Sequence, residues 1–383
     1  MPTTGTQYRQ INVRSPFYVE RTTTAAEVTL YLRVWTGSLG FGRPTAATYV
    51  INKDATGGKV IFEISELIRD YIEQGDSIYA LNTCWVETFL QDTAIPDESV
   101  TYLATEGYTI HTELPQKSGD AFVDSFVMLP KDLNGNYRLT GAKGVMSMCQ
   151  IMTNATNTSD WRVVENYADG SNFQYGYTAA LTGSSNTIIQ TLLLSEDTVS
   201  VDFDLDGREA TLYHDLFDCN KYNTPMRTDD PLVGYQRPSF YDEDLQRPVV
   251  LTYVNKHGAK NTFAFTLKHT EEITSSSQSF KRNVLNYDSV SSFNSKHSSR
   301  KILKDSKQVF TINTDYINEY YVEQLQELIL SEYVWANIAH VSSNLIPVTL
   351  IDKKISKKNH VNDKLIQYTF KIEVARDYIN TIR

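Results

Sequence analysis

The residues that most resemble a binding site are three aspartates at alternate positions. Asp202, Asp204 and Asp206 are followed by Gly207, which is the opening spacing of a calcium-binding EF-hand loop. Such a loop requires a bidentate glutamate at its twelfth position, and that position here is Tyr213. The aspartates also alternate with apolar residues, as in a β-strand, namely Val199, Val201, Phe203 and Leu205. We therefore expect a hydrated carboxylate face on an edge strand, able to bind a cation weakly or to dock a basic partner.

A glycine-rich segment, Gly37–Gly42, has the composition of a phosphate-binding loop. Phosphate loops work because a helix follows and points its backbone N–H groups at the anion. The residues that follow here, Thr45–Ile51, have strand character. The segment is therefore predicted to be a hairpin turn and not a nucleotide site.

The histidines do not form the pairs that metal or hydrolase chemistry uses. None lies three or four residues from another, and the metalloprotease, α/β-hydrolase and P-loop signatures are absent. His214–Asp215 is the one adjacent pair of histidine and acid, and no recognisable nucleophile motif accompanies it. A glycosidase needs only two carboxylates, and their separation in space cannot be read from the local sequence. A glycan hydrolase therefore remains an alternative. We expect no enzyme, no cofactor and no metal site.

Charge is distributed unevenly along the chain. The formal net charge of −10 argues against general nucleic-acid binding, which uses a basic surface. Glu196–Asp244 holds 13 acidic and 4 basic residues, whereas Lys281–Lys307 holds 7 basic and 2 acidic residues. A second basic segment is Lys353–Lys364. We expect the basic segments to be solvated or to meet the acidic region of a neighbouring copy, or the acidic face to line a conduit for DNA.

Composition places the chain among globular proteins. At 383 residues it is long enough for two or three domains, and it shows neither a secretory signal nor an apolar run long enough to span a membrane. Cys84, Cys149 and Cys219 lie far apart and are predicted to be buried thiols in a reducing compartment. The 24 tyrosines suit strand faces and subunit interfaces.

The N-terminal domain is predicted over residues 1–115. Glu27–Trp35 alternates apolar and polar residues, which indicates a strand with one face inward. Lys59–Phe62 is a further strand, and a short helix over Glu66–Gln74 is predicted, with Ser65 as its cap and Gly75 after its end. Strand character resumes over Ser77–Leu90 and Ser99–His111.

Two further domains are predicted over residues 116–245 and 246–383. The first is an acidic β domain with long loops between the short apolar segments Phe122–Leu129, Val145–Met152 and Thr187–Leu194. The second starts with a hairpin, Val249–Asn255 and Asn261–Lys268. After a Ser- and Lys-rich excursion, Thr274–Lys307, it continues with four elements: strand Gln308–Ile312, a helix near Tyr316–Leu330, and strands Ile346–Ile351 and Leu365–Val374.

The predicted helix has one apolar face. Ile317, Tyr321, Leu325 and Leu328 line that face, and Thr314 or Asp315 is expected at the cap. The helix is expected to pack on a sheet that contains Ile346–Ile351 and Leu365–Val374.

Several segments together resemble virion tail proteins of tailed phages that infect Bacteroidetes-type hosts, including the crAss-like phages. The segments cover both ends of the chain and leave out about residues 115–245; they are Ile11–Val19, Phe62–Tyr71, Leu251–Gly258 with Phe263–Phe265, Phe310–Asp315 and Gln367–Ala375. The order of elements at the C-terminus is similar to the tail-tube fold, in which sheets join edge to edge into a barrel. Leu365–Val374 is the expected edge.

The resemblance implies a structural subunit of a phage tail hub, baseplate or ring. Such a subunit assembles as a homo-oligomer around the DNA channel, docks other tail proteins and contacts passing DNA, but no membrane. It is located in the virion tail after synthesis in the bacterial cytoplasm. The fold expected is mainly β and multi-domain, with β-sandwich-like domains and a C-terminal tail-tube-like sheet plus one packed helix. The alternative is a receptor- or carbohydrate-binding module at the tail tip, which would use aromatic loops such as Asn172–Tyr177.

Overall fold

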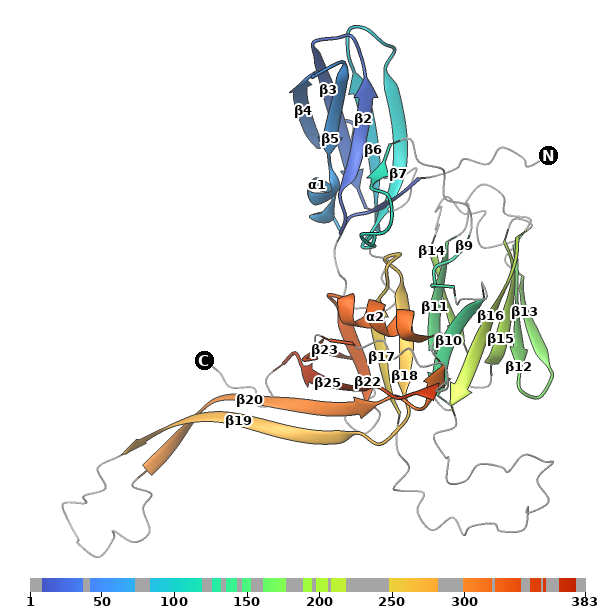
Figure 1. Ribbon diagram of the computed structural model, residues 1–383, viewed down its shortest axis with the longest axis vertical. Coiled ribbons are helices and arrows are strands. Elements are labelled where there is room, and N and C mark those ends of the chain that lie inside the picture. Colours follow the sequence, from blue (N-terminus) through green and yellow to red (C-terminus); the bar gives the residue numbers. More distant parts are fainter. Residues whose placement is uncertain are drawn as a thin grey trace, which may run out of the picture. The chain divides into compact units, whose positions relative to one another are not determined.

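The fold is mainly β, as the sequence predicted. The computed structural model describes residues 9–36, 42–72, 83–118, 126–131, 136–142, 147–152, 161–176, 189–194, 198–205, 208–217, 248–281, 299–318, 321–338, 345–352, 354–355 and 365–376 (Figure 1). Across these residues the chain forms 25 strands and two helices. The predicted loop Gly37–Gly42 lies outside the described residues except for Gly42.

The chain divides into two compact units. The first holds Met1–Asp218, Thr252–Ala264 and Asn318–Glu332, and the second holds Cys219–Leu251, Phe265–Ile317 and Tyr333–Arg383. The three predicted domains remain a prediction, although each sheet of residues 1–118 and 126–217 is built from strands of that range alone.

Residues 9–118 form a β-sandwich. A five-stranded sheet has the order β1-β7-β6-β3-β4, and a three-stranded sheet has the order β5-β2-β8. The strands are β1 (Arg9–Asn12), β2 (Phe17–Thr22), β3 (Glu27–Trp35), β4 (Tyr49–Asp54), β5 (Lys59–Glu63), β6 (Thr83–Gln91), β7 (Glu98–Thr105) and β8 (Gln116–Lys117). The predicted strand Glu27–Trp35 has the same bounds as β3, because its alternate residues Val28, Leu30 and Leu32 fill the core between the sheets.

The first helix, α1 (Ser65–Arg69), is shorter than predicted, and its cap was assigned wrongly. Ile64 occupies the N-cap position without a side-chain hydrogen bond. The hydroxyl of Ser65 donates to Glu63 and so does not cap the helix. Residues 73–82, which include the predicted end at Gly75, lie outside the described residues.

A second sandwich covers residues 126–217. One sheet has the order β10-β16-β15-β12-β13 and the other has the order β14-β11-β9. Buried residues from both sheets, such as Cys149, Val163 and Phe203, share one core. The strands are β9 (Phe126–Val127), β10 (Tyr137–Ala142), β11 (Ser147–Met152), β12 (Trp161–Tyr167), β13 (Asn172–Gly176), β14 (Ile189–Leu194), β15 (Thr198–Leu205) and β16 (Arg208–Phe217).

The second unit is built on a sheet with the strand order β18-β17-β22-β23-β25-β20-β19, of which β17 and β18 continue into the first unit. β21 and β24 form a separate pair. The strands are β17 (Val249–Val254), β18 (Lys260–Phe265), β19 (Thr270–Lys281), β20 (Ser299–Asn313), β21 (Ile317–Asn318), β22 (Val334–Ile338), β23 (Ile346–Leu350), β24 (Leu365–Ile366) and β25 (Thr369–Val374). The predicted hairpin Val249–Lys268 is confirmed as β17 and β18.

The second helix, α2 (Val322–Leu330), starts later than predicted. Ile317 belongs to β21, and the Thr314 hydroxyl accepts a hydrogen bond from the Tyr368 N–H at 2.8 Å, so Thr314 holds a strand and does not cap the helix. Tyr321, Leu325 and Leu328 are buried, as expected for the inner face. The Tyr321 ring meets Phe263 of β18 in the same unit, with the ring centroids 6.2 Å apart; the predicted packing on β23 and β25 stays a prediction.

Candidate assembly surface

The hairpin of β19 and β20 contains a long exposed strand. The two strands pair antiparallel from Thr270 opposite Thr311 to Lys281 opposite Ser299, and Figure 1 shows them running side by side as a long ribbon. Every residue of β19 is exposed.

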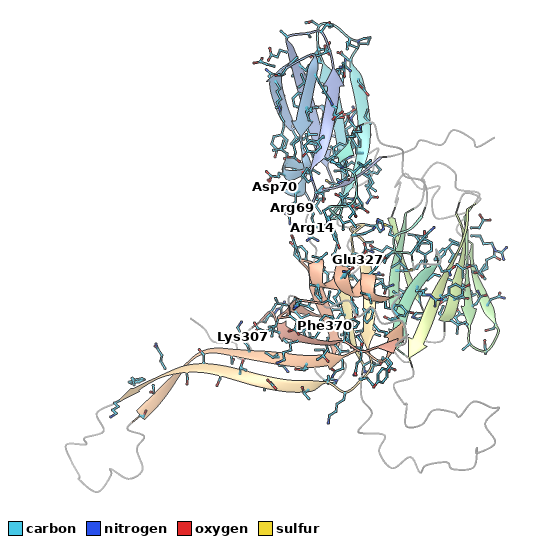
Figure 2. The ribbon with its side chains drawn as sticks, viewed as in Figure 1. Arg14, Arg69, Asp70, Lys307, Glu327 and Phe370 are labelled. Carbon is cyan, nitrogen blue, oxygen red and sulfur yellow. The ribbon has the colours of Figure 1, made fainter. Side chains whose placement is uncertain are left out.

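Only the base of this ribbon is anchored in the sheet. Val309–Asn313 of β20 pairs with β25, and Phe310 and Ile312 are fully buried there. Lys307, labelled in Figure 2, forms an ion pair with Glu373 of β25 at the end of this anchored part. Beyond it, Thr274–Lys281 and Ser299–Lys307 have each other as their strand partners among the described residues.

A two-stranded ribbon of this kind is marginal in water without a third strand or a packed face. Its strand β19 buries little, since Ile273 and Phe280 remain 52% and 43% exposed. The outer edge of β19 also presents a row of backbone N–H and C=O groups. The distal part of the ribbon therefore has the features of a surface that another chain completes.

The part of β19 between Ile273 and Phe280 lacks the devices that usually keep an edge strand from pairing. Such edges carry proline, charged side chains or bulges, whereas Ile273–Phe280 contains no proline, glycine or charged residue. The register shift of the hairpin lies on β20: Ser276 is opposite Asp305 and Ser277 is opposite Leu303. The outer edge of β19 therefore runs without interruption.

The predicted edge strand, Leu365–Val374, was wrong. Within this segment β25 lies between β20 and β23, so both of its edges are paired. Its Phe370, labelled in Figure 2, and its Ile372 are buried in the sheet. The real edge lies in residues that the sequence assigned largely to a Ser- and Lys-rich excursion. The absence of glycine and proline over Thr270–Lys281 was the signal that could have revealed it.

The strand at the other end of the sheet order is covered. All residues of β18 are buried. In the first unit its Lys260 N–H donates to the Gln150 side chain at 2.8 Å, and its Ala264 N–H donates to the Thr140 hydroxyl at 3.1 Å. Side chains thus accept hydrogen bonds from two backbone N–H groups of β18, whereas the outer edge of β19 has no comparable side-chain acceptors among the described residues.

Charge distinguishes the C-terminal part of the chain, which includes the ribbon, from the part that precedes it. Residues 246–383 hold 19 basic and 13 acidic residues, and residues 1–245 hold 17 basic and 33 acidic residues. The two strands of the ribbon include five basic positions, of which Arg300, Lys301 and Lys304 have side chains outside the described part. Most of the predicted basic segment Lys353–Lys364 and much of the acidic segment Glu196–Asp244 also lie outside it.

A second polar site lies where the loop between β17 and β18 meets the N-terminal sandwich. The carbonyl of His257 accepts hydrogen bonds from the Gln10 side chain at 3.1 Å and from the Thr105 hydroxyl at 2.9 Å. The Tyr108 N–H donates to the Lys256 carbonyl at 2.8 Å. The segment Leu251–Gly258, which carries part of the resemblance, therefore contacts residues of the N-terminal sandwich here, one of which, Gln10, directly precedes the segment Ile11–Val19.

The shape of this loop depends on Asn255 and Gly258. The Asn255 side-chain oxygen accepts hydrogen bonds from the N–H groups of His257 and Ala259, both at 3.0 Å. Gly258 has a φ of +78°, and a Cβ there would lie 2.7 Å from the backbone nitrogens of Glu106 and Gly107. Only glycine fits this position without displacement of the sandwich.

Two arginines hold the end of α2 in the first unit (Figure 2). Arg14 donates to the carbonyl of Leu330 at 2.9 Å and lies 3.4 Å from Glu332. Arg69 lies 2.5 Å from the other carboxylate oxygen of Glu332. A cation at a helix C-terminus is stabilising because it opposes the partial negative charge of the last carbonyls. These contacts hold the C-terminal end of the helix against the sandwich.

Buried ionisable groups lie under α2. Burial raises the pKa of the Glu327 carboxyl to about 8, against the smaller opposing effect of Lys256. Burial also raises the pKa of Tyr253, and the charge of Glu327 adds to that shift. Burial and the nearby Lys256 lower the pKa of His257 to about 4. Near neutral pH the carboxyl and the imidazole are thus both held largely uncharged.

A serine and a histidine meet inside the second sandwich. Ser147 Oγ lies 2.9 Å from His214 Nε2, and His214 Nδ1 lies 2.7 Å from the Thr198 carbonyl, to which it must donate. This geometry is that of a nucleophile and its base, but both side chains are buried and a Cβ at Gly141 would lie 2.1 Å from Nε2. No room for a substrate remains at this pair, which joins the two sheets of the sandwich. The side chain of Asp215 lies outside the described part.

Two of the alternating aspartates, Asp202 and Asp204, lie in a strand, as the patterning indicated, but not in an edge strand. β15 lies between β12 and β16, so its edges are paired. Exposed Asp202 accepts hydrogen bonds from Asn166 at 2.9 Å and from Thr211 at 2.8 Å. Asp206 and Gly207 lie outside the described residues. The residues that the structure describes contain no cluster of three potential metal ligands.

Cys84 and Cys149 are buried, and burial raises the pKa of each thiol to about 12, whereas Cys219 lies outside the described residues. In the aromatic segment, Phe173 of β13 is 53% exposed. Neither described helix is long and apolar enough to cross a membrane.

Comparison with known proteins gives no family for this chain. It matches no protein-family model, and no curated protein is similar to it in sequence. The candidate site therefore rests on the exposed edge of β19 and on the residues around it.

Proposed function

We propose that this chain is a structural subunit of a bacteriophage tail, in the hub, baseplate or a ring around the DNA channel. The observation that carries the assembly role is the open, twelve-residue edge of β19. Long edges of this kind are avoided in proteins that stay monomeric, because they pair with other chains. A closed assembly of identical copies satisfies such an edge.

The tail assignment is supported by the segments that resemble phage tail proteins. Within the first unit, one of these segments has a structural role: the loop Lys256–Gly258 joins the N-terminal sandwich through hydrogen bonds and a close glycine contact. Such a joint stiffens the connection between the sandwich and the strand pair that follows it. Rigid joints and open strand edges together suit a load-bearing subunit.

Charge supports the same role. Residues 1–245 carry a net negative charge and residues 246–383 carry a net positive charge. Each copy therefore has two regions of opposite charge. Neighbouring copies and other tail proteins dock with complementary charge, and a net charge of −10 keeps passing DNA from sticking to the chain.

Labelling of virions tests this proposal. Antibodies raised against the purified chain should bind the tail or the neck of phage particles in negative-stain images, and the purified chain should form closed particles of uniform size. Labelling restricted to host cell debris, with none on any particle, would contradict a virion role.

A receptor- or carbohydrate-binding module at the tail tip is the second candidate, because Phe173 is exposed on the edge strand β13. Sugars stack on exposed aromatic rings in such sites, since each ring presents a broad apolar face. A glycan array separates the two candidates: specific binding lost in Phe173→Ala favours the binding module, and no binding favours the structural subunit.

A further inference from the structure

We propose that β19 pairs antiparallel with β19 of a second copy of this chain, about a two-fold axis at Ser276. The proposal rests on the assembly role given above and names the partner of the open edge. The result is a four-stranded sheet in which each copy contributes its β19 and β20. Such a sheet exceeds the two-stranded ribbon that is marginal alone.

Symmetry restricts how two identical strands can pair. In an antiparallel pair a two-fold axis lies midway between two directly opposite residues, so one residue of the strand must face its own copy. A residue before the central residue then faces, on the other copy, the residue that lies equally far after it. Each such pair occurs twice in the dimer. The register is therefore defined by the choice of one central residue.

Charge selects Ser276 as the centre. Glu271 and Lys281 each lie five residues from Ser276, so this register places each Glu271 opposite Lys281 of the other copy. A shift of the axis to Ser275 or Ser277 would set Lys281 against His269 or Ile273. Opposite charges that face each other across neighbouring strands are stabilising, and like charges are destabilising.

Side-chain size permits the approach. The centre of β19 consists of Ser275, Ser276 and Ser277, whose small side chains leave the backbone groups accessible. All three are exposed, and the strand keeps its continuous register on this side because the extra residue of the bulge is on β20. The self-complementary charges favour a second copy of β19 as the partner, because pairing with a different strand of another protein would not require them.

Charge variants test the pairing in trans. Glu271→Lys alone and Lys281→Glu alone should each weaken self-association by about tenfold, because two opposite-charge pairs become like-charge pairs. A mixture of these two variants should associate as tightly as the unchanged chain, since both pairs then have opposite charges again. Glu272→Lys, a matched control that faces Phe280 in this register, should change association less. Failure of the mixture to restore association overturns the proposal.

Cysteine cross-linking tests the register independently of affinity. In a Cys219→Ser background, Ser276→Cys should form a disulfide-linked dimer under mild oxidation, because directly opposite residues lie within disulfide reach. Thr274→Cys should stay reduced alone and should cross-link with Gln278→Cys when the two are mixed. Assembly without these cross-links would overturn the β19 pairing and leave the structural role standing. A chain that is monomeric at all concentrations would overturn both.

Discussion

Glu271 and Lys281 project from the same face of β19, at equal distances on either side of Ser276. Gln308 of β20 donates to the Glu271 carboxylate at 2.5 Å, which holds this acid in place at the base of the ribbon. The strand is thus acidic at its anchored end and basic at its distal end. An edge with this arrangement is complementary to an antiparallel copy of itself.

Truncation of Leu325 should destabilise the unit that contains α2. The side chain is fully buried, and removal of a buried leucine side chain costs about 2–5 kcal/mol. Leu325→Ala should therefore lower the free energy of unfolding measured by urea denaturation. Leu330→Ala is the matched control on the same helix, because Leu330 is 50% exposed; equal losses in the two variants would show that the buried face is misassigned.

Substitution of Gly258 should damage the joint between the loop and the N-terminal sandwich. Gly258→Ala introduces a Cβ that lies 2.7 Å from backbone atoms of Glu106 and Gly107, in addition to the strain of a positive φ. Gly57→Ala is a matched control, since Gly57 also has a positive φ and no atom within 4 Å of its added Cβ. The control should lose about 1 kcal/mol from the φ strain, and Gly258→Ala should lose clearly more in the same denaturation experiment.

Alternating patterns predicted the core strands well, because burial imposes the alternation. β3 carries its apolar residues on one face and was predicted with its observed bounds, and the β17–β18 hairpin was predicted from two apolar runs around Gly258. The start of α2 was placed too early, because Ile317 and Tyr321 fit a helical face although Ile317 belongs to β21. An apolar residue at helical spacing does not show where the helix begins.

The assembly surface could not be predicted from the same signals. β19 buries no side chain, so its sequence carries no alternation, and pairing with β20 is what makes it a strand. The predicted edge at Leu365–Val374 failed for the opposite reason, since a strand rich in apolar residues is covered on both sides. Neither Ser147 nor His214 carries a local motif, because they come together only through the packing of β11 and β16.

Glu327 should make the stability of its unit depend on pH. Its folded-state pKa of about 8 exceeds the ordinary value of a carboxyl group, so the folded state prefers the protonated form. The contribution to stability is therefore fully present below about pH 4.5 and is lost as the pH rises through about 8. Glu327→Gln, which keeps the shape without the charge, should lose less stability than the unchanged chain between pH 5 and pH 8.

The control for this experiment is Glu66→Gln, because Glu66 is exposed on the other helix of the same unit. It should leave the pH profile of thermal unfolding unchanged. His257 acts in the opposite direction, since its lowered pKa of about 4 removes stability only as the pH falls below about 6.5. A profile that is the same in Glu327→Gln and in the unchanged chain would exclude Glu327 as its source.

Docking between the acidic and basic regions of neighbouring copies should respond to salt and to charge reversal. Exposed ion pairs contribute about 0–1 kcal/mol each and are screened over about 8–10 Å near physiological salt. Asp202→Lys with Asp204→Lys, or Lys301→Glu with Lys304→Glu, should weaken assembly, and the combination should partly restore it. If the aspartate pair leaves assembly intact and slows DNA passage in infection assays, the acidic face lines the DNA channel.

Sedimentation velocity over a range of concentrations measures whether this chain assembles through the outer edge of β19. The unchanged chain should form larger species as its concentration rises. Ser276→Lys, which places a charge at the middle of the edge, should remain monomeric, whereas Thr349→Lys, at an exposed position of β23 in the same sheet, should assemble normally. Assembly of Ser276→Lys that equals that of the unchanged chain, or a monomer at every concentration, would contradict the account.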